Sequence, residues 1–232
     1  MEKLLTSVWF VFTAILPIWG CGDGDEPKSD QELKEVVASV DRIRQASQKT
    51  LEQRDSQGYT TLMLAVSSFQ ENVDAVQALI QRGVDVNAKT ADGSTALAFA
   101  FLYNREQVAK ILFAGGATPQ WENEANMSLL HAAALGGDGF VFDLVDEPFI
   151  RSHAHQKNSE GNSPLHQAIQ VFSGASYHRS FIKRAVESKL FDLSLQNTEG
   201  KTACELAIAS WGEEDTQVAT QLIDDLCTYP KS

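Results

Sequence analysis

A short pattern of polar and apolar residues recurs five times along the chain. Each copy has a glycine or asparagine, a serine or threonine two residues later, and then an apolar run with a leucine or cysteine at its centre. The central residues are Leu62, Leu97, Leu130, Leu165 and Cys204, so successive copies lie 35, 33, 35 and 39 residues apart. A nearly constant interval of this length predicts an array of stacked repeats. Such arrays present extended binding surfaces.

Each copy of the pattern predicts the start of a helix. The hydroxyl residues at 60, 95, 128, 163 and 202 can accept a backbone N–H at a helix start, and Pro164 suits the first helical turn. The glycines at 58, 93, 161 and 200 suit a positive φ just before the helix, and Asn126 tolerates one. Gly83 and Gly116 follow second apolar segments and are expected to end a second helix.

The residues around two of these copies carry a family resemblance. Residues 163–166 read Ser-Pro-Leu-His, and residues 83–87 read Gly-Val-Asp-Val-Asn, followed by Asp92-Gly93. In phase over roughly residues 31–227, the pattern resembles the ankyrin repeat. The resemblance implies an all-α solenoid of about five ankyrin repeats, each a helix-turn-helix with a β-hairpin loop. The predicted core consists of Leu62, Leu97, Leu130 and Leu165, with Ile80 and Ile111.

The pattern also divides the chain into segments. We expect a signal peptide over residues 1–20, an acidic tether over 21–30, N-terminal capping helices over 31–54 and the ankyrin-repeat domain over 55–229. The capping helices are needed because the ends of a solenoid must shield its core. Two departures stand out: Pro148 is predicted to stop the second helix of the third unit, and a Gly/Ser stretch over 171–179 predicts a longer loop in the fourth.

The first 21 residues differ from the rest. An apolar run of 16 residues from Leu4 to Trp19 is shorter than the roughly 20 that cross a bilayer, and it fits the apolar part of a secretory signal. The run ends Ile18-Trp19-Gly20-Cys21, which resembles a bacterial lipobox with Cys21 as the lipidated residue. The bulky Trp19 departs from that pattern. A retained membrane anchor and a simple cleaved signal are the alternatives.

Composition narrows the class of partner. The formal net charge is −12. Nucleic acid requires a basic face, so an acidic chain argues against it, and the same charge argues against binding anionic lipid other than through the covalent anchor. An acidic surface favours basic partners by electrostatic steering, or serves solubility alone. We therefore expect a monomer that binds a protein, with contact to the membrane only through the lipid.

Little in the sequence points to catalysis, a cofactor or a metal. No nucleophile elbow, phosphate loop or Cys-x-x-Cys occurs, so we expect no enzyme and no cofactor. His131 and His166 lie in the helix-start pattern and are expected to bond the backbone of their own hairpins. His153 and His155 alternate in a predicted extended arm, but a metal would need a third ligand. Cys204 and Cys227 form either a disulfide, which an exported compartment permits, or two buried thiols.

The expected binding site follows from the repeat register. In the ankyrin architecture, hairpin tips and first helices line a concave face, so we predict partner contacts at the tips. The residues are Tyr59, Lys89, Trp121, Glu122, Glu124, Lys157, Glu160, Asn197 and Glu199. Trp121 is read as an exposed aromatic anchor, of the kind that dominates interfaces. The alternative is that it folds back on Pro119 and the neighbouring hairpin.

Two functions from different classes remain. The first is a non-catalytic lipoprotein of the bacterial cell envelope, facing the periplasm, that engages a protein partner through its hairpin tips and concave face. Its sharper form is an immunity or inhibitor protein against a toxin. The alternative is a scaffold that stabilises a periplasmic enzyme, for example in oxidative-stress defence.

Overall fold

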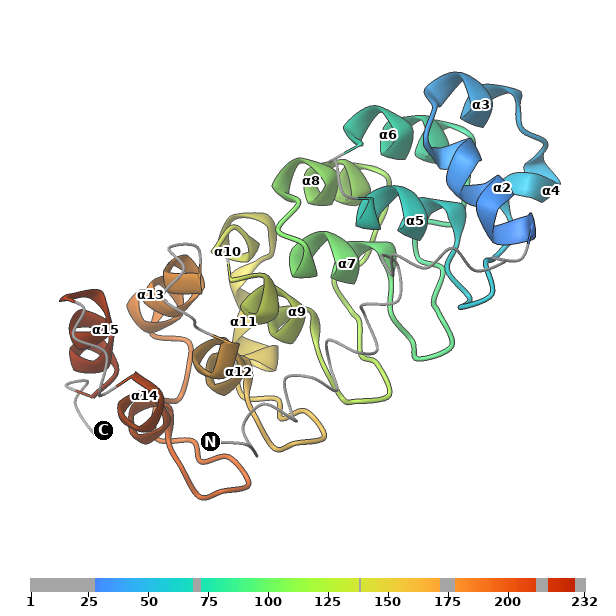
Figure 1. Ribbon diagram of the computed structural model, residues 1–232. Coiled ribbons are helices and arrows are strands. Elements are labelled where there is room, and N and C mark those ends of the chain that lie inside the picture. The colour runs from blue at the N-terminus through green and yellow to red at the C-terminus, as the bar shows by residue number, and fades with distance from the viewer. Residues whose placement is uncertain (1–27, 69–71, 138, 172–177, 212–216, 228–232) are drawn as a thin grey trace.

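The computed structural model describes residues 28–68, 72–137, 139–171, 178–211 and 217–227. In these ranges the chain forms helices joined by turns and hairpin loops (Figure 1). The helices are α2 (Lys28–Val37), α3 (Val40–Gln45), α4 (Gln48–Leu51), α5 (Thr61–Ser67), α6 (Val73–Gln81), α7 (Ala96–Leu102), α8 (Glu106–Ala114), α9 (Leu129–Gly136), α10 (Val141–Leu144), α11 (Glu147–His153), α12 (Pro164–Val171), α13 (His178–Ser188), α14 (Ala203–Trp211) and α15 (Gln217–Cys227). Cys21 and the predicted signal peptide lie outside the described residues, as does most of the predicted long loop of the fourth unit.

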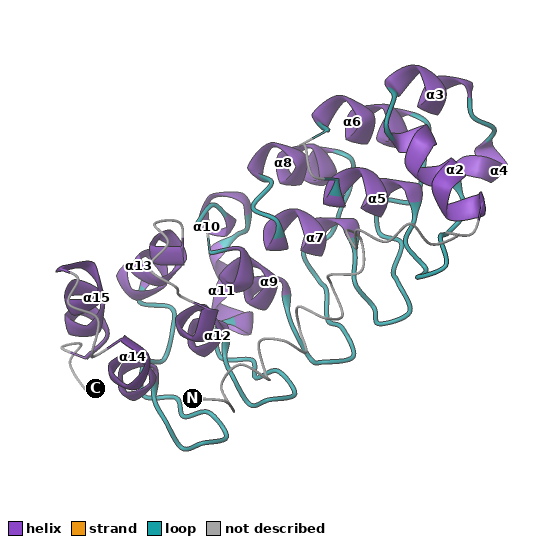
Figure 2. Cartoon of the chain, viewed as in Figure 1, coloured by secondary structure: helices purple, strands orange, loops and turns teal. Residues whose placement is uncertain are grey.

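The helices stand in two rows. In one row α5 packs on α7, α7 on α9, α9 on α12 and α12 on α14. The second row contains α6, α8, α10, α13 and α15, and the hairpin loops project along the opposite edge of the first row (Figure 2). Within the described ranges the β-structure consists of isolated bridges at the hairpin bases, such as Lys89 with Thr95. The predicted all-α solenoid is confirmed.

The helix starts form as the sequence predicts. The Thr60 and Thr95 hydroxyls accept the backbone N–H groups of Met63 and Ala98, which satisfies donors that a helix leaves open in its first turn. The residue two positions before each cap has the predicted positive φ, from +54° at Asn126 to +89° at Gly93. The helix ends also agree: Gly83 and Gly116 have φ of +75° and +92°.

A cap of three short helices covers the first repeat. It begins earlier than expected, because α2 starts at Lys28 and so takes in the end of the predicted tether. Asp30 lies in the first turn of α2 and is buried, and its carboxylate accepts both the backbone N–H and the hydroxyl of Ser56. Arg82 at the end of α6 donates to the carbonyls of Ile43, Arg44 and Ala46. Hydrogen bonds thus join the cap to the stack.

The third unit departs from the two-helix plan in an unexpected way. Its second helix is reduced to the single turn of α10, and the chain then forms α11. The prediction that Pro148 stops a helix is wrong, since Pro148 lies in the first turn of α11 behind the N-cap Asp146, whose carboxylate accepts the Phe149 N–H. Proline fits there because the first turn needs no N–H from it.

The core agrees with the predicted leucines. Leu62, Leu97, Leu130 and Leu165 are all buried. Ile80 and Ile111, also predicted as core, are only half-buried. The reason is that the fully buried positions on α6 and α8 are taken by the adjacent Leu79 and Leu112.

Candidate functional site

The row of five hairpins is the candidate binding surface, and one side chain organises the turn of each. The turn residues Asp55, Asn123, Asn158 and Asn197 each accept two backbone N–H groups, from the residues two and four positions later. In the second hairpin the hydroxyl of Thr90 accepts the N–H of Ser94. Asp and Asn suit this role because their side chains mimic a backbone turn. In the sequence, this turn residue stands three positions before the residue with a positive φ in every hairpin.

This role corrects the prediction for Asn197. It was placed among the partner-binding residues, but it is buried and both ends of its amide are engaged. Its oxygen accepts the N–H groups of Glu199 and Lys201, and its Nδ2 lies 3.3 Å from Oδ1 of Asn162. Asn197 therefore builds the hairpin and is withdrawn from the candidate surface.

Hydrogen bonds also tie each hairpin to the next. A guanidinium nitrogen of Arg54 donates to the carbonyls of Gly58 and Lys89, both at 2.8 Å. Further along the row, the N–H of Glu124 donates to the Asp92 carbonyl at 2.9 Å, and the Thr198 hydroxyl donates to the Glu160 carbonyl at 2.7 Å. The hairpin tips are thus held in a fixed spacing, which reduces the ordering entropy that a partner must overcome on binding.

His131 bonds the backbone of its own helix start, as predicted, and both helix-start histidines also reach the next hairpin, which the sequence did not predict. Nδ1 of His131 accepts the N–H of Ser128 at 3.1 Å, so Nε2 carries the proton and donates to the carbonyl of Asn162 in the next unit at 3.0 Å. His166 repeats the contact, with Nε2 3.0 Å from the Lys201 carbonyl. The spacing of the repeats brings that carbonyl within reach.

Burial lowers the pKa of His131 to about 4 and lowers the pKa of His166 in the same direction. A folded-state pKa below the unfolded value of 6.5 means that the unfolded chain binds more protons between the two values. The stability contributed by neutral His131 is therefore present above pH 6.5 and is lost as the pH falls toward about 4.

We expect the free energy of unfolding to fall by about 2 kcal/mol through His131 alone between about pH 7 and pH 5. Urea titrations across that range measure the slope. The variant His131→Gln, which can keep the Ser-x-x-Gln capping box, should show a shallower pH dependence. Equal slopes in the two proteins would contradict the assignment.

The two aromatic residues predicted as contacts are not exposed, and both predictions are corrected. Trp121 is 5% exposed, and its Nε1 donates to the Gly93 carbonyl of the preceding hairpin at 2.7 Å. The structure thus agrees with the alternative prediction, in which Trp121 folds back toward the neighbouring hairpin. Tyr59 is buried against Phe99, with 5.3 Å between ring centroids. Aromatic side chains beside a neighbouring repeat gain more by packing there than by facing water.

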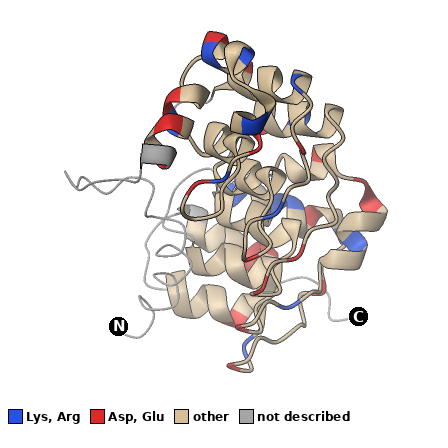
Figure 3. Cartoon of the chain, turned by 90° about the vertical axis from the view of Figure 1, so that its right-hand side faces the viewer, with Lys and Arg blue, Asp and Glu red and all other residues tan. Residues whose placement is uncertain are grey.

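What remains exposed at the tips is mainly charged. Lys89, Glu122, Glu124, Lys157 and Glu199 are exposed, and Glu160 is half-buried. Figure 3 shows acidic and basic residues interspersed along the hairpins. These side chains lie at the rim of the molecule, where charges act mainly on association rate and salt dependence.

The predicted pair His153 and His155 does not form part of a metal site in the described part of the chain. There, no three His, Cys, Asp or Glu residues are grouped so as to hold a metal ion. The predicted extended arm of the third unit is helical at His153, whose ring stacks on Phe149 with 4.0 Å between centroids. His155 instead accepts the backbone N–H of Asp192 at 3.0 Å. The two rings therefore have separate structural partners.

A hollow of about 500 Å³ lies beside α10, α11 and α13. It is lined by the apolar residues Phe142, Val145 and Ile150 and by Arg151 and Arg184. Both arginines form ion pairs, Arg151 with Glu147 and Arg184 with Asp143. The shortened second helix of the third unit lines this hollow.

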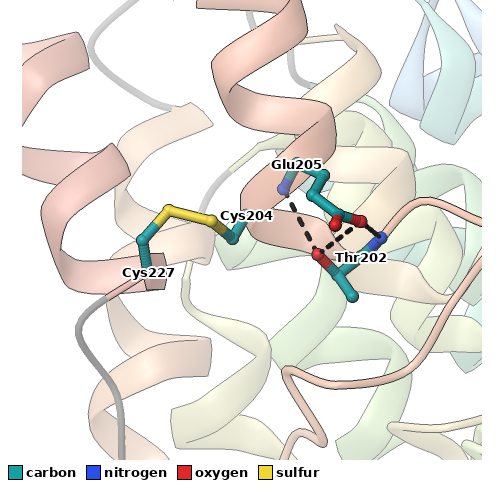
Figure 4. The surroundings of a disulfide bond; sticks show 4 residues. All are labelled: Thr202, Cys204, Glu205 and Cys227. Atoms are coloured by element: carbon teal, nitrogen blue, oxygen red, sulfur yellow. Dashed lines mark hydrogen bonds between the residues drawn. A yellow bond between two sulfur atoms is a disulfide. The ribbon is translucent and has the colours of Figure 1, made fainter.

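A disulfide closes the last repeat. Cys204 on α14 and Cys227 at the end of α15 are bonded, with Cα atoms 5.1 Å apart (Figure 4). Beside it, Thr202 and Glu205 cap α14 reciprocally: the Thr202 N–H donates to the Glu205 carboxylate and the Glu205 N–H donates to the Thr202 hydroxyl. The sequence left open whether Cys204 and Cys227 form a disulfide or remain two buried thiols, and the structure contains the disulfide.

The family model described as ankyrin repeats, in three copies, matches residues 38–123. Residues 38–123 therefore contain ankyrin repeats. The chain is 33% identical over 146 residues to protein PhlB of Serratia liquefaciens, covering 62% of this chain and 63% of that protein. It is 30% identical over 152 residues to the human SH3 and multiple ankyrin repeat domains protein 2, covering 63% of this chain and 8% of that protein.

Solved structures share the ankyrin-repeat fold. The ankyrin repeat protein EF0377 matches with a TM-score of 0.65 and 20% identity over 85% of this chain and 97% of its own. A chain in the structure of the Bdellovibrio bacteriovorus endopeptidase Bd0816 with immunity protein Bd3460 matches with a TM-score of 0.62 and 23% identity, over 85% and 99%. The chain spans 63% of the length of protein PhlB and 8% of the length of the human protein, so it matches only part of each of these curated relatives.

Ankyrin repeats are generally non-enzymatic scaffolds for protein interaction, and the family model places such repeats in residues 38–123 of this chain. Among the residues that the structure describes, no helix has the length and apolar character to cross a membrane.

Proposed function

We propose that this chain binds a protein partner through the charged tips of its hairpins, as a lipid-anchored protein of the bacterial cell envelope. The observation that carries the binding surface is the row of hairpins itself: each is closed by its own turn residue, and neighbours are joined by hydrogen bonds. Rigid tips with exposed charges of both signs can bind selectively to a partner whose surface charges are complementary to them.

A more specific form of the proposal is that the bound partner is a toxic enzyme, which this chain inhibits. It is supported by the shared fold with a chain in the complex of a predatory endopeptidase with an immunity protein. That likeness is one of fold, at 23% identity, so it supplies a class of partner to test. A concave repeat surface suits this role because it can cover a convex enzyme surface over several units.

Reversing two acidic tips should weaken binding of the partner. The double variant Glu122→Lys, Glu124→Lys changes the tip of the third hairpin, where both side chains are exposed. For a partner recovered from envelope extract, we expect the association rate constant at low salt to fall about tenfold, and the difference to shrink near 1 M salt, where the Debye length is about 3 Å. Stopped-flow or surface-based kinetics measure this.

The matched control is Asp41→Lys, Asp74→Lys, which makes the same change in net charge at exposed positions of α3 and α6, away from the tips. Equal rate losses in the two double variants would remove the tips from the encounter. If the partner is an enzyme, an assay of its activity distinguishes the two functions. Loss of enzyme activity on binding supports inhibition. Unchanged activity together with greater stability of the bound enzyme supports a scaffold.

The anchor is a separate proposal, carried by the Ile18-Trp19-Gly20-Cys21 pattern. We expect Cys21→Ser to abolish acyl labelling and to move the protein out of the membrane fraction. Retention of the variant in the membrane with residues 1–20 uncleaved would favour an uncleaved anchor over the lipid.

A further inference from the structure

The hollow beside α10, α11 and α13 exists because the third unit departs from the two-helix plan. The second helices α6 and α8 have nine residues each, whereas α10 has four before the chain turns into α11. Both α10 and α13 belong to the second row, away from the hairpin loops (Figure 2). The volume of the hollow, about 500 Å³, lies in the range of small-molecule sites, roughly 300–1,000 Å³.

Four apolar side chains line the hollow. They are Phe142, Val145, Ile150 and Leu190. Val145 and Ile150 are buried, and the other two are half-buried. An apolar group of a ligand placed here would remove part of this surface from water, which is favourable in proportion to the area covered. The hollow can therefore hold the apolar body of a ligand.

The hollow also carries one positive charge without a partner. Of the charged side chains that line it, four form ion pairs: Arg151 with Glu147, Arg184 with Asp143, and Glu187 with Lys183. The fifth, Lys189, is exposed and has no ion pair in the part of the chain that the structure describes. A ligand that contacts the Lys189 ammonium therefore breaks no existing ion pair.

The backbone at Lys189 is one that disfavours a side chain. Its φ is +57°, and the second helices of the first two units end on Gly83 and Gly116 in the same left-handed region. A lysine in that region is less stable than a glycine, which has no Cβ to clash. A strained residue at the edge of a cavity is a reason to expect a function for its side chain. At Lys189 that function would be its charge.

We propose that this hollow binds an organic monocarboxylate, with the carboxylate on the Lys189 ammonium and an apolar body against the four apolar side chains. A lysine ammonium is a compact point charge that suits a single negative charge. A doubly charged phosphate would meet more repulsion from Glu147 and Glu187, which also line the hollow.

The net charge of the whole chain does not prevent an anion from binding there. The chain carries a formal net charge of −12, but exposed charges at physiological ionic strength are largely screened beyond about 8 Å. The nearby Lys189 ammonium therefore outweighs distant carboxylates. This site is separate from the hairpin tips and goes beyond the function proposed above.

The test titrates the full chain with phenylbutyrate at physiological ionic strength and follows chemical shifts by NMR. We expect shift changes confined to α10, α11 and the end of α13. Lys189→Gly should weaken binding about fivefold or more, because the carboxylate loses a charged hydrogen-bond donor. The same variant should have a higher melting temperature, because glycine adopts the left-handed backbone without strain. Opposite effects on binding and stability exclude misfolding as the cause of the lost binding.

Two variants and one compound serve as controls. Lys189→Arg keeps the positive charge and should retain binding. Lys157→Gln makes the same change in net charge as Lys189→Gly, but at the exposed tip of the fourth hairpin, and should bind like wild type. Phenylbutanol has the same apolar body without the charge and should bind about fivefold more weakly than phenylbutyrate.

Equal affinity of the wild type and Lys189→Gly for phenylbutyrate would overturn the proposal, and so would failure of phenylbutyrate to bind at millimolar concentration. Equal affinity for phenylbutanol and phenylbutyrate would mean that the hollow takes apolar bodies whatever their charge, which contradicts a carboxylate site. Tighter binding of phenyl phosphate than of phenylbutyrate would overturn the choice of a monocarboxylate as the ligand.

Discussion

Trp121→Ala is expected to lower the free energy of unfolding by about 3–5 kcal/mol, the range for truncating a buried tryptophan. The indole is buried between two hairpins, and its Nε1 donates to the Gly93 carbonyl at 2.7 Å. The truncation removes apolar contact, leaves a cavity and deprives that carbonyl of its donor. Chemical denaturation followed by circular dichroism measures the loss.

Trp121→Phe separates packing from the hydrogen bond. It keeps an aromatic ring but no N–H, so we expect a smaller loss, on the order of 1–2 kcal/mol. A change of less than about 0.5 kcal/mol in the alanine variant would contradict the buried position, since surface substitutions fall in that range. In that case Trp121 would again be a candidate contact residue for the partner.

Reduction of the Cys204–Cys227 disulfide is expected to destabilise the chain by about 3 kcal/mol. The bond closes a loop with a sequence separation of 23 residues, and the chain-entropy model predicts roughly that stabilisation for a loop of this length. The effect should concentrate in α14 and α15, since each unit of a solenoid contacts only its neighbours. Hydrogen exchange of the α15 amides should rise most.

The experiment is cleanest in a Cys21→Ser background, where Cys204 and Cys227 are the remaining cysteines. Denaturation with and without a dithiol reductant gives the difference. The variant Cys204→Ala, Cys227→Ala is the control, and the reductant should not change its stability. Insensitivity of the bridged protein to reductant, with free thiols detected after treatment, would show that the bond contributes nothing to stability.

Local features of this fold could be read from the sequence. The helix starts at Thr60 and Thr95, the positive φ at Asn126 and the helix ends at Gly83 and Gly116 each depend on a few consecutive residues. Hydroxyl capping and left-handed backbone are properties of single residue types. Repetition of these signals at a constant interval then specifies the solenoid, because one unit cannot bury its apolar side alone.

Contacts between units could not be read in this way. The sequence placed Trp121, Tyr59 and Asn197 at exposed tips, and the structure buries all three. Their surroundings are made by residues of a neighbouring unit, about one repeat away in the chain, so no local pattern reports them. The hydrogen bond between His131 and the Asn162 carbonyl was not predicted for the same reason, because its partner lies in the next unit.

The clearest case is the position shared by Ile169 and Ile208. The residue type and its place in the pattern are identical, yet one is buried and the other is 51% exposed. The sequence by itself determined the repeating unit, the starts of its first helices and its apolar centre. Only the tertiary structure decided which side chains beyond those central positions are covered, because their burial depends on whether another unit stacks against them.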